Sequence, residues 1–69
     1  MKLTRCLKVL RTTTRIEYRL MLHEGTVNTY SIHKVDYVAH KIQRTIVSDV
    51  RAKEAVMLIW NDIEMGEQA

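Results

Sequence analysis

Three histidines, one cysteine and one carboxylate are the residues of this chain best suited to metal binding or nucleophilic chemistry. They are His23, His33, His40, Cys6 and Asp36. Asp36 and His40 are four residues apart, so on a helix they would share a face and could share a divalent cation. Zinc sites use three or four close ligands, and Cys6 is distant in sequence. We therefore expect an Asp36–His40 charge pair, no metal site and no cofactor.

Motifs of catalysis are absent from the sequence. It contains no GxSxG, CxxC, HExxH or glycine-rich phosphate loop. We assign Ser31 to a strand, Ser48 to a helix cap and Cys6 to a packed small hydrophobic side chain. A chain of 69 residues also has little room for a water-excluding pocket. We expect a non-enzymatic protein without a small-molecule substrate.

The length of the chain predicts one small domain spanning residues 1–69. A domain of this size buries only about 60% of its unfolded surface, so it often needs a disulfide, a metal or a second subunit. Cys6 is the only cysteine, which excludes an internal disulfide and favours the reducing cytoplasm. Charges interrupt the apolar residues of the N-terminus, and no apolar run approaches the length of a membrane span.

The charge of the chain is unevenly distributed. Residues 1–22 carry six basic residues and one acidic residue, whereas residues 48–69 carry two basic and five acidic residues. The basic part could bind an anionic partner, or the two parts could attract each other within the fold.

Alternating residues predict a β-hairpin in the first half. Residues 15–22 alternate apolar and polar side chains, and residues 26–34 are rich in β-forming residues. A three-residue loop from His23 to Gly25, with a type I turn and a bulge at the glycine, would place Tyr18 opposite Tyr30. Residues 2–10 are compatible with a strand or a helix, and we assign them to a third antiparallel strand.

Helical periodicity predicts two helices in the second half. The apolar residues of the first helix share one arc: Val35, Val38, Ala39, Ile42 and Ile46. The second helix is expected to begin with Ser48 as its N-cap, to run to about Met65 and to end at Gly66. The predicted fold class is α+β, with a small antiparallel sheet followed by two helices.

The second predicted helix has two apolar stripes. One, with Ala52, Val56, Ile59 and Ile63, suits the sheet. The other contains Met57, Leu58 and Met65, with Asn61 as a polar residue within it. Because the first helix also needs the sheet, we expect the second stripe to form a homodimer through paired final helices. The alternative is a monomer in which Leu58 is exposed.

A candidate surface for another protein lies on the first predicted helix. Tyr37 falls outside the apolar arc, beside Lys41 and Arg44, and Tyr and Arg are enriched at the centres of interfaces. The basic hairpin face at Arg15 and Arg19 is the second candidate. We expect a homodimeric protein that binds and modulates another protein, such as a host regulator or ATPase.

The order strand, helix, helix across residues 27–65 resembles the ribbon-helix-helix family of dimeric DNA-binding regulators. This resemblance implies that Thr29, Ser31 and His33 face the bases and that Ser48 contacts phosphate. The outward strand face has no arginine, and a preceding hairpin strand would occupy the ribbon edge. DNA-binding regulation is therefore the alternative function.

In size and character the chain resembles small accessory proteins encoded by bacteriophages. It is short, basic, free of motifs and poor in glycine and proline. Such proteins often bind and inhibit a host regulator, polymerase or ATPase. The resemblance implies inhibition of a protein partner and assigns no residue.

Overall fold

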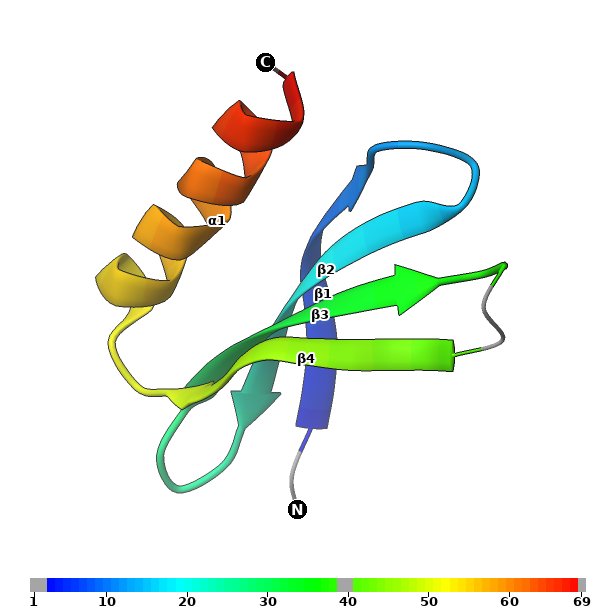
Figure 1. Ribbon diagram of the computed structural model, residues 1–69. Helices are drawn as coiled ribbons and strands as arrows, with labels where there is room; N and C mark the ends of the chain where they lie inside the picture. The colour runs from blue at the N-terminus through cyan, green and yellow to red at the C-terminus, as the bar shows by residue number, and fades with distance from the viewer. Residues whose placement is uncertain (1–2, 39–40, 69) are drawn as a thin grey trace.

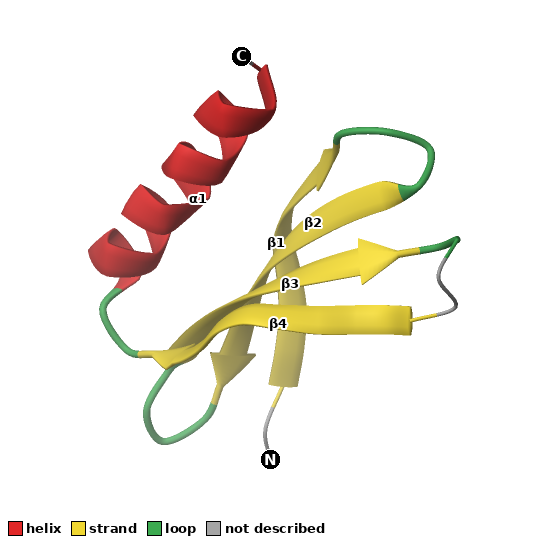
Figure 2. Cartoon of the chain, viewed as in Figure 1, coloured by secondary structure: helices red, strands yellow, loops and turns green. Residues whose placement is uncertain are grey.

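Four antiparallel β-strands and one α-helix make up the described chain. The computed structural model describes the backbone of residues 3–38 and 41–68 and the side chains of residues 3–38 and 44–66. The elements are β1 (Leu3–Arg11), β2 (Ile16–Glu24), β3 (Thr29–Asp36), β4 (Lys41–Val50) and α1 (Lys53–Gln68). The strands lie in the order β1-β2-β3-β4, so each pairs with its neighbour in the chain. The helix α1 lies against one face of this sheet (Figures 1 and 2).

The predicted N-terminal strand and hairpin are confirmed, but the register of the hairpin was wrong. Tyr18 lies opposite Lys34, and Leu22 rather than Tyr18 lies opposite Tyr30. The turn falls after Glu24, where the Gly25 amide donates to the Asn28 side-chain oxygen at 3.4 Å. Neither glycine has a positive φ, so the predicted glycine bulge is absent. Because the register differs by an even number of residues, every side chain keeps its predicted face.

The predicted two-helix arrangement is wrong. Residues 35 and 36 end β3, and residues 41–50 form β4. Val35, Ile42 and Ile46 fit a helical arc, but β-branched side chains also pack well on a pleated sheet. Pairing with β3 satisfies the backbone hydrogen bonds of this segment, as a helix would, and it also packs Val47 against the core. Ala39 and His40 lie outside the described residues.

The strand β4 is irregular. Its register against β3 shifts at three places, and Asp49 has a φ of 59° beside one of them. Aspartate is among the few residues that tolerate this left-handed conformation. Ser48 and Asp49 therefore belong to a bulged strand rather than to a helix cap as predicted.

The helix α1 begins at Lys53 and continues past Gly66 to Gln68, so both predicted ends were wrong. Its predicted core stripe is confirmed in Val56, which is fully buried, and in Ile59 and Ile63, which pack against the core. Ala52, the fourth residue of that stripe, is exposed and precedes the helix, so this part of the prediction was wrong. No helix in the described part of the chain is long and apolar enough to cross a lipid bilayer.

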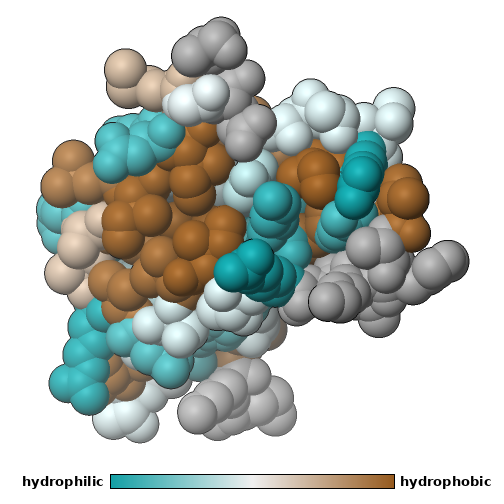
Figure 3. All heavy atoms as spheres, viewed as in Figure 1, coloured by the Kyte–Doolittle hydropathy of each residue, from teal (hydrophilic) through white to brown (hydrophobic). Residues whose placement is uncertain are grey.

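The core lies between α1 and the centre of the sheet. Its buried members are Tyr18, Leu20, Ile32, Val56 and Trp60. The Trp60 indole N–H donates to Glu64 one helical turn later, which satisfies the ring's polar group. Seen as in Figure 1, hydrophobic side chains remain visible in a broad patch where α1 meets the sheet (Figure 3). The core itself is buried, but part of the apolar surface around it stays exposed.

Candidate functional site

The face of the sheet that α1 does not cover, here called the open face, carries a network of polar side chains. Along β2, alternate residues turn to this face: Glu17, Arg19, Met21 and His23. The register places Arg19 opposite His33 and Met21 opposite Ser31. Two groups result, one around Tyr37 and one around Ser31, and both follow from the period of two in β2 and β3.

The first group, here called the Tyr37 cluster, consists of Arg11, Glu17, Arg19 and Tyr37. The Glu17 side chain is only 4% exposed and binds Arg11 Nη2 at 3.0 Å and Arg19 Nε at 2.6 Å. The Tyr37 hydroxyl donates to Glu17 Oε2 at 3.0 Å and accepts from Arg19 Nη2 at 3.2 Å. Hydrogen bonds from Arg11 and then Arg19 lower the pKa of Glu17 below its ordinary value. Glu17 is thus a carboxylate held in its charged form.

Two turns of the chain bring this cluster together. The backbone amide of Tyr37 donates to the carbonyl of Arg15 at 3.0 Å. The Arg15 side chain in turn binds both carboxylate oxygens of Asp36, at 3.2 and 3.3 Å. These bonds join the β1–β2 turn to the end of β3, so Tyr37 is held over the open face.

The second group is a bridge of side chains that crosses all four strands. Ser31 Oγ lies 2.7 Å from His23 Nε2 and 2.8 Å from His33 Nε2. The outer ring nitrogens reach Thr4 Oγ1 at 3.4 Å and Thr45 Oγ1 at 3.3 Å. Because a hydroxyl has one hydrogen to donate, Ser31 donates to one imidazole and accepts from the other. When both imidazoles are neutral, they are therefore opposite tautomers.

This bridge is poorly placed for nucleophilic catalysis. Ser31 is 2% exposed and its oxygen is engaged on both sides, so a substrate carbonyl cannot reach Oγ without displacing an imidazole. Burial lowers the pKa of His33, and the charges of His23 and Arg19 lower it further. In the described part of the chain, every buried side-chain nitrogen and oxygen has a hydrogen-bond partner. The arrangement fastens the strands to one another.

The described side chains offer little to a metal ion. Among them, no group of three or more histidine, cysteine, aspartate or glutamate residues is close enough to hold one. The predicted Asp36–His40 pair involves a residue outside the described ones, and Asp36 binds Arg15. Cys6 was predicted to be packed, but it is exposed, and its thiol donates to the Lys8 carbonyl at 3.5 Å.

The structure brings together three of the five predicted partner-binding residues. Tyr37, Arg15 and Arg19 lie at the same end of the sheet, and Tyr37 is 49% exposed as predicted, although it is not on a helix. Arg44 is exposed opposite Lys34, on the face that carries α1. The side chain of Lys41 lies outside the described residues.

Three of the four residues predicted for a dimer interface, Leu58, Asn61 and Met65, share one exposed face of α1, and their pairing in a dimer stays a prediction. Met57 is partly buried against the core. Leu58 and Met65 are 66% and 71% exposed, and Asn61 is exposed as well. The predicted pairing depended on a second helix competing for the sheet, and the segment assigned to that helix forms strands.

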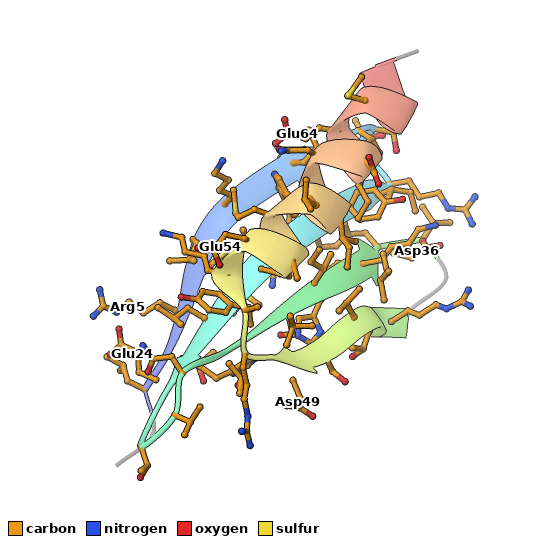
Figure 4. All side chains as sticks on the ribbon, turned by 90° about the vertical axis from the view of Figure 1, so that its left-hand side faces the viewer. Arg5, Glu24, Asp36, Asp49, Glu54 and Glu64 are labelled. Atoms are coloured by element: carbon orange, nitrogen blue, oxygen red, sulfur yellow. The ribbon has the colours of Figure 1, made fainter. Side chains whose placement is uncertain are left out.

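Carboxylates neutralise much of the basic N-terminal part. Arg5 binds Glu24 at 2.7 Å, and these two residues lie side by side at one end of β1 and β2 (Figure 4). Arg11, Arg15 and Arg19 also have carboxylate partners. The element order behind the ribbon-helix-helix resemblance is absent, Ser48 caps no helix, and Ser31 and His33 bind each other. Thr29, the third residue assigned to the bases, begins β3.

Sequence reasoning missed Glu17 and the Ser31 bridge. The signal for Glu17 was present, because Arg15, Glu17 and Arg19 alternate within one predicted strand. The bridge was missed because the predicted loop placed His23 in a turn, whereas His23 lies within β2.

Comparisons with known proteins returned no match: no family model, no curated protein and no solved structure is similar to this chain.

Proposed function

We propose that this chain is a non-enzymatic binding protein that modulates another protein through the Tyr37 cluster. The observation that supports the proposal is the half-exposed Tyr37 ring, whose hydroxyl is fixed by Glu17 and Arg19. A ring already held in one position loses little conformational freedom when a partner covers it. Tyrosine and arginine are also the residue types that dominate interface energetics.

The chemistry around the ring favours a partner surface that is both apolar and acidic. Arg11 and Arg19 share one carboxylate, so the Tyr37 cluster has a net positive charge. The Arg11 side chain is 66% exposed. Val9, two residues before Arg11, and Val38, the residue after Tyr37, are 56% and 62% exposed. We expect aliphatic groups of the partner to pack on the tyrosine ring while its carboxylates approach Arg11.

DNA binding is the weaker function for this chain. Four of the six basic residues in residues 1–22 already bind carboxylates, which reduces the charge available to phosphate. We expect no DNA consensus to be selected from a random pool at physiological salt. We further propose a cytoplasmic location, where the exposed Cys6 stays reduced.

The test compares wild-type protein with Tyr37→Ala, Tyr37→Phe and the control Asn61→Ala on the exposed face of α1. Each protein is immobilised and used to capture partners from cells of the native host. A captured protein is then purified and its affinity for each variant is measured by calorimetry. We expect Tyr37→Ala to weaken binding about thirtyfold or more, and Asn61→Ala to have no effect.

The phenylalanine variant separates the ring from its hydroxyl. It keeps the apolar contact but releases Glu17 and Arg19, so we expect a smaller loss of affinity than for alanine. Equal affinity of Tyr37→Ala and wild type, with the fold retained by circular dichroism, would refute the proposal. Equal loss in Asn61→Ala would place the binding surface on α1 instead.

A further inference from the structure

The strand β1 is an edge of the sheet, and in the described part of the chain no strand pairs with its outer side. All of its residues are exposed except Leu10, which is partly buried. The helix α1 contacts chiefly β3 and β4, at the other side of the sheet. Leu3, Leu7 and Val9 are 52%, 42% and 56% exposed. A nine-residue edge with exposed aliphatic side chains presents unpaired backbone groups to any strand that can align with it.

The opposite edge is less suited to pairing. The strand β4 changes register against β3 at three places, whereas β1 changes register against β2 at one place, between Cys6 and Lys8. Bulges of this kind interrupt an edge and turn its backbone groups out of line. Of the two edges, β1 is therefore the one that can accept another strand.

The chain also exposes more surface than a compact monomer of its mass. Its solvent-accessible surface is 5105 Å², whereas about 4500 Å² is expected for a folded chain of this mass. Its radius of gyration is 12.3 Å, against about 11 Å expected. The excess of roughly 600 Å² approaches the surface that one partner contributes to a stable interface.

We propose that β1 pairs antiparallel with β1 of a second copy, joining two sheets into one. The two-fold axis would be perpendicular to the sheet, so both open faces lie on one side and both helices on the other. The helix α1 packs over the centre of the sheet and contacts chiefly β3 and β4, so it leaves the outer edge of β1 open to a second strand. The charges of Arg5 and Arg11 repel the second copy of β1 only weakly, because Arg5 binds Glu24 and Arg11 binds Glu17.

The faces of β1 restrict the register of this pairing. Leu3, Arg5, Lys8 and Leu10 lie on the face of α1, and Thr4, Cys6, Val9 and Arg11 lie on the open face, with Leu7 as the extra residue of the bulge. Among two-fold registers that pair at least six residues of each β1, two keep like faces together. In one, Arg5 lies opposite Lys8 of the second copy; in the other, Arg5 lies opposite Leu10.

Electrostatics selects between these registers. Arg5 opposite Lys8 would occur twice by symmetry and would place like charges directly across the new strand pair, which is unfavourable. In the other register, Arg5 meets Leu10 and Lys8 meets Leu7. The two Lys8 side chains then lie diagonally across the two-fold axis, so one diagonal pair of cations replaces two direct pairs. The remaining pairs of that register are Arg11 with Thr4 and Cys6 with Val9.

The test uses sedimentation equilibrium and a disulfide across the proposed interface. Wild-type protein at micromolar concentration should have twice the chain mass of 8.1 kDa. Residues directly opposite in antiparallel strands have Cα atoms about 4.5–5.5 Å apart, which suits a disulfide. Val9→Cys should therefore form a covalent dimer with the natural Cys6 under mild oxidation. Leu58→Cys on α1 and the double variant Cys6→Ser/Val9→Cys should form none.

A third variant, Leu58→Asp, separates this interface from one on α1. We expect its mass to stay at two chains. The proposal is overturned if the wild-type protein is a monomer at all concentrations. The edge of β1 would then be open to an acidic strand of another protein. Failure of Val9→Cys to form the covalent dimer, or dissociation of the dimer in Leu58→Asp, overturns the proposal equally. Far-ultraviolet circular dichroism of each variant confirms that the fold is retained.

Discussion

The hydroxyl of Tyr37 lies 3.0 Å from the Glu17 carboxylate, which Arg11 and Arg19 also bind. Tyr37 follows the end of β3, whereas Glu17 is near the start of β2. This contact makes the exposed tyrosine part of a buried charge network, so its position depends on a residue 20 places earlier in the chain.

Replacement of the buried carboxylate should destabilise the fold. In Glu17→Gln the two arginines lose their anion, and we expect the free energy of unfolding to fall by about 1.5–3 kcal/mol. Glu24→Gln is the matched control, because Glu24 also binds an arginine but its side chain is 31% exposed. The free energy of unfolding of Glu24→Gln should fall by at most about 1 kcal/mol. Urea unfolding, followed by the fluorescence of Trp60, measures the free energy of unfolding of both variants. Equal losses in the two variants would show that burial does not strengthen the ion pairs of Glu17.

Acidification should weaken the fold through His33. Its pKa in the folded protein lies below the ordinary value of 6.5, because of burial and then the charges of His23 and Arg19. The unfolded chain therefore binds a proton more readily, and the free energy of unfolding falls as the pH drops below 6.5. Ser31 and Thr45 are the other groups that face this ring, and neither carries a charge.

The variant His33→Gln isolates this effect, because glutamine keeps polar atoms near Ser31 but does not titrate. Between about pH 7.5 and about pH 5.5, the stability of wild type should fall more than that of the variant. Urea unfolding at the two pH values gives the comparison. A variant that loses as much stability as wild type would assign the pH dependence to other groups.

Truncation in the core should be far more costly than truncation on the outer face of α1. Leu20 is fully buried, so Leu20→Ala should lower the free energy of unfolding by about 2–5 kcal/mol. Leu58 is 66% exposed, so Leu58→Ala should change it by no more than about 0.5 kcal/mol. Thermal or urea unfolding of the two variants tests the position of α1 on the sheet. A large loss for Leu58→Ala would show that its side chain is covered in solution.

The local sequence determined which side of each early strand faces the core. The alternation of residues 15–22 correctly separates Tyr18 and Leu20 from Glu17 and Arg19, because side-chain direction in a strand depends only on a period of two. The stripe of Val56, Ile59 and Ile63 likewise followed from helical geometry, even though both ends of the helix were misplaced.

Tertiary structure decided the register of β2 against β3 and the conformation of residues 35–38 and 41–46. The apolar spacing of Val35, Ile42 and Ile46 satisfies a helical arc, and the same β-branched residues suit a strand. What distinguishes the two outcomes is the availability of β3 as a hydrogen-bonding partner, and this is a property of the assembled sheet. The turn at residues 25–28 sets that sheet's register, and the register in turn places His23 beside Ser31. Tyr37 reaches Glu17 for the same reason, since their contact depends on strand pairing between distant segments.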